Sequence, residues 1–290
     1  MVKLVVKRGD ESHFLYETTV STVTSSVIKD LVAIHNGRLK IERLCAEISE
    51  LSDHGVSLPP NMQGLTDEQI VDLKLKDECG EACKPSGGSV DCKDEVGRRN
   101  GCAPNDKMKE VLRKTMSEAK KIVSKDQIKA NVCITQDMLK EAVDQLRGAV
   151  TIVYPMGLPP YDPICMEFED KEELAGTQAS LQVLEDSTTS IWFSGKELQV
   201  DKKLEQYVGK NEKTKLIVKL HKRGSGPPGR EPVFSEEQRK EMMLDAYRRQ
   251  EEWKKLEEDN ENSYLDSAWA DSSTLKKQFQ GLKDVSWHPR

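Results

Sequence analysis

Apolar and polar residues alternate at the start of the chain and then change to a helical spacing. Residues 2–6 are rich in strand-forming residues and residues 13–19 alternate, on either side of a Lys-Arg-Gly-Asp turn, which predicts a β-hairpin. Apolar side chains then recur every three or four residues in 27–32 and again in 41–51. Asn36-Gly37 between them is typical of a helix C-terminal cap. Residues 1–76 are therefore expected to form a hairpin followed by helices.

The middle of the chain carries helix start signals on both sides of a segment without periodicity. Thr66 opens a capping box for a short helix, and Asn105 and Thr135 are expected to cap two longer amphipathic helices. Residues 77–104 between these signals are rich in Cys and Gly and predict an irregular loop. Residues 105–148 are expected to form a helical segment.

The apolar period changes to two after residue 148. The segments 150–154, 164–168, 190–193 and 215–221 alternate, and 171–185 has helical spacing, which gives the strand and helix order of a β-grasp fold. We therefore expect residues 149–224 to form a ubiquitin-like β-grasp domain. In its last strand three residues are expected to face inward, namely Leu216, Val218 and Leu220. Ile217 is the one apolar residue in the outward set.

The second half of this segment resembles ubiquitin in sequence, over 191–198, 203–207 and 212–214. Ser225 and further residues follow Gly224, so the resemblance implies an embedded module and not a modifier. Trp192 takes the place of the central isoleucine in the recognition patch of ubiquitin, which implies a partner anchor. The alternative is that Trp192 packs under the Pro159-Pro160 loop or against the following helix.

Residues 225–290 read as a Gly- and Pro-rich linker, a charged helix and a largely extended tail. Ser235 is expected to cap a helix over 236–258 with many pairs of opposite charge at i,i+4. In the tail, Leu275, Phe279 and Leu282 form an apolar stripe. The stripe either folds back on the body or binds a groove of a partner. The sequence thus predicts an α+β fold with partner-binding residues in the sheet and in the tail.

Four of the seven cysteines lie close together in the chain, as Cys79, Cys83, Cys92 and Cys102. Four thiolates can hold a tetrahedral zinc ion, but the spacing lacks the tight CxxC pair of common zinc sites. We therefore expect ordinary thiols, no metal site and no cofactor. An odd number of cysteines without a signal-like apolar start favours a reducing, cytoplasmic location.

Charge and residue spacing exclude several functional classes. The 44 basic and 50 acidic residues give a net charge of −6, which argues against nucleic-acid binding. No apolar run approaches the roughly 20 residues that span a bilayer, so we expect no membrane insertion. The five histidines are scattered, and no spacing suggests a nucleophile with its base. We therefore expect a protein that is not an enzyme.

Six longer strings resemble one family from end to end: VKRGDES (6–12), LPPNMQGLT (58–66), GRRNG (97–101), LRGAV (146–150), VYPMGLPPYDP (153–163) and YVGKNEKT (207–214). They are similar to the Kurly proteins, a cilia- and flagella-associated family. The resemblance implies a non-catalytic adaptor in cytoplasmic assembly of outer dynein arms, and in cilium positioning and planar polarity.

The same resemblance implies a location in the cytoplasm and at the cilium basal body. It implies partners such as a MYND-type zinc-finger dynein assembly factor, chaperones or other dynein-assembly proteins. The alternative function is a structural component that is stably bound to the axoneme or basal body.

Overall fold

The computed structural model describes residues 1–229, 234 and 236–266. The chain divides into two compact units, Met1–Arg230 and Glu231–Arg290. The expected α+β class is confirmed, since the first unit contains a mixed sheet and several helices.

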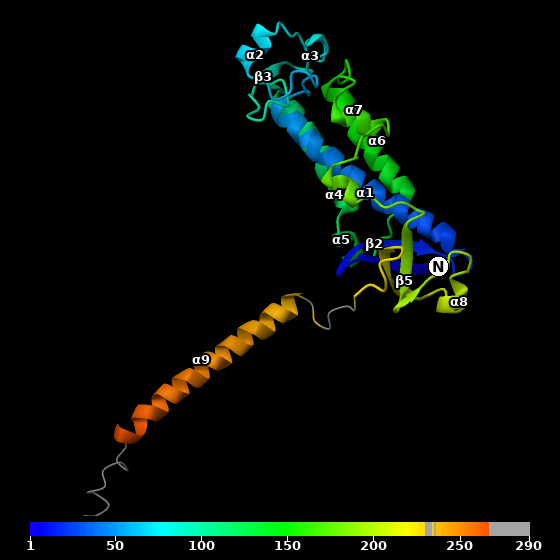
Figure 1. The fold of residues 1–290 in the computed structure, drawn as a ribbon, viewed down its shortest axis with the longest axis vertical. Helices are drawn as coiled ribbons and strands as arrows, with labels where there is room; N and C mark the ends of the chain where they lie inside the picture. The colour runs from blue at the N-terminus through cyan, green and yellow to red at the C-terminus, as the bar shows by residue number, and fades with distance from the viewer. Residues whose placement is uncertain (230–233, 235, 267–290) are drawn as a thin grey trace, which may run out of the picture. The chain divides into compact units, whose positions relative to one another are not determined.

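The main sheet takes its strands from both ends of the first unit (Figure 1). Its members are β1 (Val2–Arg8), β2 (Glu11–Thr18), β5 (Thr189–Phe193), β6 (Lys196–Glu197) and β7 (Lys215–Lys222), in the order β2-β1-β7-β5-β6. β1 pairs with β2 in an antiparallel hairpin and with β7 in parallel. The hairpin prediction is therefore confirmed, and the hairpin lies beside β7, a strand more than 200 residues further along the chain.

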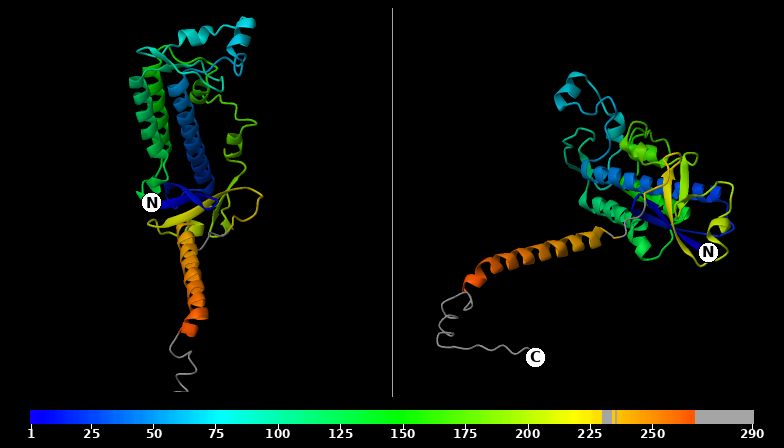
Figure 2. Two further views of the ribbon diagram at one scale, coloured as in Figure 1. Left: turned by 90° about the vertical axis from the view of Figure 1, so that its left-hand side faces the viewer. Right: turned by 60° about the horizontal axis from the view of Figure 1, so that its bottom comes forward.

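One long helix, α1 (Thr24–His54), connects the sheet to the opposite end of the unit. At 1.5 Å per residue it is about 46 Å long. Its apolar side chains are buried along the whole length, from Val27 and Leu31 to Ile48 and Leu51. It also contacts α4 (Asp106–Val123) and α6 (Gln136–Val153), which pack against each other. Figure 2 shows the three helices side by side above the sheet.

The predicted helix end at Asn36-Gly37 is wrong, because α1 runs through both residues. The Asn36 side chain donates to the Leu184 carbonyl (2.8 Å) and accepts from the Leu184 N–H (3.0 Å), so it holds a distant loop and does not end the helix. A Cβ at Gly37 would lie 3.0 Å from Leu139 Cδ1 of α6. Gly37 therefore serves close helix packing and not a left-handed cap.

The far end of the helices carries a small layer of short elements. It contains α2 (Asp67–Asp72), α3 (Glu78–Ala82), β3 (Ser89–Asp91), β4 (Cys102–Pro104) and α7 (Pro163–Phe168). The loop expected over 77–104 thus holds a short helix and an antiparallel strand pair. The expected caps are confirmed, since Thr66, Asn105 and Thr135 each accept a backbone N–H of the helix that follows.

The strands predicted at 150–154 and 164–168 are wrong. The first belongs to α6, in which Ala149, Val150 and Val153 are buried while Ile152 is 61% exposed, a helical and not an alternating pattern. The second is α7, where Asp162 accepts the Ile164 N–H as N-cap and Pro163 starts the helix.

The helix predicted at 171–185 is also wrong. Only a short 3₁₀ turn, η1 (Gln178–Leu181), forms there, and Asn36 of α1 holds the chain that follows it. Two further short helices complete the unit, α5 (Asp126–Lys129) and α8 (Glu205–Val208). Because β1 and β2 precede residue 149, the boundaries 149–224 do not enclose the sheet.

The predicted orientation of β7 is confirmed. Leu216, Val218 and Leu220 are 7%, 2% and 4% exposed and belong to the main core, whereas Ile217 is 45% exposed. The alternation of apolar and polar residues in β7 therefore predicts correctly which side chains face the core and which face away from it.

The second unit contains α9 (Glu236–Asp266), which runs beyond the predicted end at residue 258. Ser235 and the stripe of Leu275, Phe279 and Leu282 lie outside the described residues. None of the helices that the structure describes has the length and apolar character needed to cross a bilayer.

Candidate partner-binding face of the sheet

Trp192 lies on the face of the sheet that is turned away from the core. Its neighbours in β5, Ile191 and Phe193, pack against the core, so strand alternation places the indole on the opposite side. Trp192 is partly buried, and its Nε1 donates to Ser190 Oγ (3.1 Å) on the same face. This hydrogen bond fixes the ring against its own strand.

The strands beside β5 place Ile217 and several lysines on the same side of the sheet. Trp192 pairs with Lys219 of β7, and Ile217 pairs with Val5 of β1. In the parallel pair of β1 and β7, Lys3 lies opposite Lys215 and Lys7 opposite Lys219. We call the surface formed by Trp192, Ile217, Lys3, Lys215 and Lys219 the outer sheet face.

Amines outnumber carboxylates around the two apolar side chains of the outer sheet face. Glu197 lies opposite Trp192, and Glu17 opposite Lys3. The Lys219 ammonium donates to the Gly229 carbonyl (2.9 Å), so the start of the linker reaches this face. An aromatic side chain and an aliphatic one within a basic surround suit a partner segment that has apolar and acidic side chains.

On this side of the sheet, the part formed by the hairpin of β1 and β2 is covered and not accessible to a partner. Val5 and Leu15 point to the same side as Ile217, yet they are 5% and 0% exposed. α5 contacts β2, and the Ile134 N–H donates to the Leu15 carbonyl (2.8 Å) at its edge. The accessible part of the outer sheet face therefore lies over β7 and β5, where Ile217 and Trp192 are.

The Pro159-Pro160 loop lies at the far end of α1 from Trp192. This loop precedes α7, which contacts α1 where Arg43 Nε donates to Glu167 Oε1 (2.7 Å). Figure 1 shows α7 and β5 at opposite ends of the helices. The interpretation in which Trp192 packs under that loop is therefore not what the structure shows.

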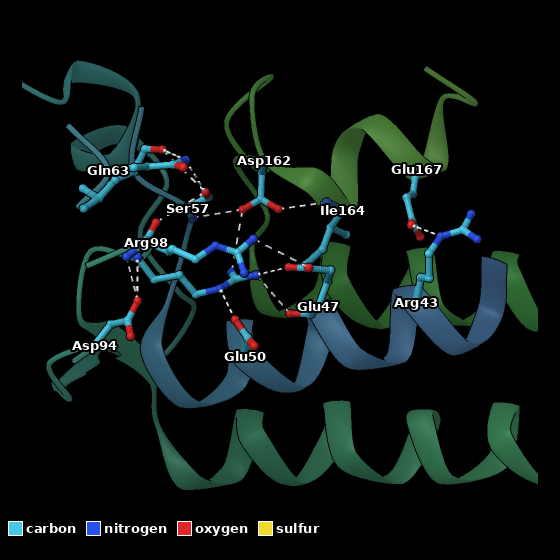
Figure 3. A network of polar contacts seen from close by, with 12 residues as sticks. Arg43, Glu47, Glu50, Ser57, Gln63, Asp94, Arg98, Asp162, Ile164 and Glu167 are labelled. Atoms are coloured by element: carbon cyan, nitrogen blue, oxygen red, sulfur yellow. Dashed lines mark hydrogen bonds and ion pairs between the residues drawn. The ribbon is translucent and has the colours of Figure 1, made fainter. Parts of the chain in front are cut away.

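A second cluster of polar residues joins the short elements at the far end to α1 (Figure 3). The Arg99 side chain is 3% exposed and donates to the Gly55 carbonyl (2.8 Å) and to Glu47 Oε2 (2.8 Å). It also lies 3.9 Å from a carboxylate oxygen of Asp162. Asp162 itself is fully buried and accepts the backbone N–H of Ser57 (3.0 Å).

These contacts fix three segments, around residues 55, 99 and 162, against one another. Because both charges are buried, their pairing matters more for local order than an exposed ion pair would. We interpret the cluster as structural. The sequence carried a signal for part of it, since Asp162-Pro163 is a typical N-cap and first helical residue, but no local pattern links Arg99 to Asp162.

The clustered cysteines lie near a cavity of about 950 Å³ at this end, which is lined by Cys83, Cys92 and Cys102 among others. All seven cysteines are free thiols. Burial raises the pKa of the Cys83 thiol, which disfavours the thiolate that a metal site or nucleophile needs. Among the described side chains, no group of three His, Cys, Asp or Glu residues is placed to hold a metal ion.

Three of the described histidines, His35, His54 and His221, form contacts of a structural kind. His35 Nε2 lies 3.0 Å from the Arg8 guanidinium and 3.3 Å from the Gln182 carbonyl. The ring nitrogens of His54 and His221 lie near backbone carbonyls, those of Cys92 and Lys222. Each of these contacts holds local structure and none activates a nucleophile.

The fold and the outer sheet face define an α+β protein with a surface suited to binding another protein. Residues 189–285 match the family model for cilia- and flagella-associated protein 298. Over 290 residues and 100% of both chains, identity is 61% with protein 298-A of Xenopus laevis, 59% with protein 298 of Homo sapiens and 51% with protein 298 of Drosophila melanogaster. No solved structure matches.

The chain therefore belongs to the cilia- and flagella-associated protein 298 family, and its role and location are related to the cilium. The matched segment includes β5, β6, β7 and α9, so it contains Trp192, Ile217 and the helix of the second unit.

Proposed function

We propose that this protein is a non-catalytic adaptor that acts in the cytoplasmic assembly of outer dynein arms and in cilium positioning and planar polarity. Membership of a cilia- and flagella-associated family is the observation that carries the proposal. The outer sheet face supports it, because a partly buried tryptophan beside an exposed isoleucine is typical of a binding anchor.

The structural contacts of His35, His54 and His221, and those of Arg99 and Asp162, support a function without catalysis. The buried charges of the Arg99 cluster are engaged with each other and with backbone groups. Function then depends on which surfaces the fold presents.

We further propose that the ubiquitin-like module is present but discontinuous. Its first half is the hairpin and α1 and its second half is β5 to β7, with residues 55–188 inserted between them. The hairpin, the helix and a last strand parallel to the first support this assignment. Trp192 then lies on the open face of the module, opposite α1.

The proposed partners are a MYND-type zinc-finger dynein assembly factor, chaperones or other dynein-assembly proteins. The lysines of the outer sheet face favour a partner segment with carboxylates beside an apolar anchor. We propose the cytoplasm and the basal body as the places where these contacts form.

The partner proposal is tested by direct binding of the purified full chain to the MYND-type factor. The double variant Trp192→Ala, Ile217→Thr is expected to weaken binding at least about tenfold, as loss of anchor residues does. Lys196→Thr is the matched control, because Lys196 is exposed in β6 and pairs with Phe193 on the opposite side. Equal affinities of all three proteins, with unchanged thermal midpoints, would exclude the outer sheet face as the binding site.

The alternative function, a structural component of the axoneme or basal body, is separated from the adaptor by fractionation of ciliated cells. An assembly factor is expected in the soluble cytoplasm and in low-salt washes. A lattice component is expected to stay with the axoneme through high-salt extraction, and this result would reject the adaptor proposal.

A further inference from the structure

The helix α9 exposes large apolar side chains, and none of its described side chains, from Glu236 to Glu258, belongs to the hydrophobic core. Every side chain from Glu236 to Glu258 is exposed. Six of them are large and apolar, with exposed fractions between 51% and 72%: Met242, Met243, Leu244, Tyr247, Trp253 and Leu256. A soluble helix with this pattern has an unpartnered face.

Four apolar residues of α9 lie on one narrow stripe. At about 100° per residue, Met242, Ala246, Trp253 and Leu256 fall within an arc of about 80°. Their separations of four, seven and three residues are those of one side of a helix. Leu244 falls on the opposite side and does not belong to the stripe.

The charged residues of α9 favour a helix that is stable without packing against a hydrophobic core. Acidic residues precede basic ones by four positions in the pairs Glu236 and Lys240, Asp245 and Arg249, and Glu251 and Lys255. This order of charges stabilises exposed helices. The helix therefore presents its apolar stripe before any partner is bound.

Charge distinguishes the two borders of the stripe. Glu241, Asp245 and Glu252 all lie along one border, about 60° to 100° from its centre. We propose that α9 is a docking helix for an amphipathic helix of another protein, one that pairs an apolar stripe with a basic border. The inference is independent of the proposed function, because it concerns a different surface.

The same charges disfavour two other occupants of the stripe. In an antiparallel pair of α9 helices the acidic border of one copy would face the acidic border of the other. In a parallel pair Glu252 of one copy would face Glu257 of the other, so both arrangements bring like charges together. Arg249 also lies within the stripe and would be brought against its copy. Acidic residues outnumber basic ones in α9, which disfavours an anionic lipid surface.

The test measures binding of the full chain to two designed helical peptides with the same leucine stripe, one with a lysine border and one with a glutamate border. We expect the lysine peptide to bind at least ten times more tightly. Trp253→Ala with Leu256→Ala is expected to remove this binding. Leu244→Ala is the control with unchanged affinity, since Leu244 lies on the opposite side of the helix.

Charge reversal at the border, Asp245→Lys with Glu252→Lys, is expected to invert the preference between the peptides. Equal affinity for both peptides, concentration-dependent dimers in sedimentation, or binding to vesicles of anionic lipid would each overturn the proposal.

A photo-crosslinker at position 253 of the full chain in extract of ciliated cells gives the second readout. The proposal expects a crosslinked segment that has helical apolar spacing and a Lys- or Arg-rich border. Crosslinks that map to residues 1–229 of the same chain would contradict it.

Discussion

At the scale of single residues, His35 makes the first unit sensitive to acid. His35 is 2% exposed, and burial, together with the nearby Arg8 cation, lowers its pKa from 6.5 to about 4. Its ring also faces His13, whose pKa is lowered by burial and Arg38. The folded protein therefore binds fewer protons than the unfolded chain between these pH values.

The free energy of unfolding is expected to fall as the pH drops from 6.5 to 4, by at most about 1.4 kcal/mol per pH unit from His35. His35→Gln should flatten this slope in urea unfolding measured across the range. His54→Gln is the control, because His54 ends the same helix and is less buried. Parallel slopes for all three proteins would show that His35 is not the sensitive group.

Arg99 joins three segments at the far end of the first unit through buried contacts. Arg99→Ala leaves the buried Asp162 carboxylate and the Gly55 carbonyl without this cation, and we expect a loss of about 3–5 kcal/mol. Arg113→Ala breaks an exposed pair with Asp53 and should cost less than about 1 kcal/mol. Urea unfolding gives both values, and hydrogen exchange over 89–105 shows whether the loss is local. A similar cost for both variants would contradict the structural role of the cluster.

At the scale of elements, Gly37 allows α1 and α6 to approach each other closely. Gly37→Leu is expected to cost about 1–3 kcal/mol, because even a Cβ there meets Leu139. Gly148→Ala in α6 has open space around its Cβ and should stabilise by up to about 1 kcal/mol. Thermal unfolding of both variants checks this, and a neutral Gly37→Leu would show that the helices are less closely packed.

Local signals predicted the elements whose cause is local. The caps at Thr66, Asn105 and Thr135 and the two faces of β7 follow from side chains within a few residues. The helix end predicted at Asn36-Gly37 was wrong because the same residue types also serve tertiary contacts, here with Leu184 and Leu139. The strand predicted at 150–154 was wrong because a short apolar run fits both a strand and the buried end of a helix.

At the scale of the whole molecule, the sequence predicted the α+β class but not which strands form the sheet. The pairing of Lys3 with Lys215 joins residues more than 200 positions apart, and no local pattern reports it. For the same reason, Trp192 was found from sequence as a candidate, whereas its position beside Ile217 and the lysines required the register of β1, β7 and β5.

This arrangement predicts which pieces of the chain fold alone. Residues 1–229 contain all five strands of the main sheet and α1, and should unfold with nearly the midpoint of the full chain. Residues 149–224 lack β1, β2 and α1, which share one hydrophobic core with Ile191, Val218 and Leu220, and should be unfolded. Circular dichroism and the dispersion of amide NMR signals of the two fragments test this. A folded fragment 149–224 would show that these residues form a continuous domain by themselves.

The central proposal is that the outer sheet face serves assembly of dynein arms, and rescue of ciliated cells that lack the protein tests it most directly. Outer dynein arms are scored after expression of the wild type, of Lys196→Thr or of the double variant Trp192→Ala, Ile217→Thr. The account predicts full rescue by the first two, whereas the double variant stays soluble and folded but leaves the arms absent. Full restoration of the arms by the double variant would contradict it.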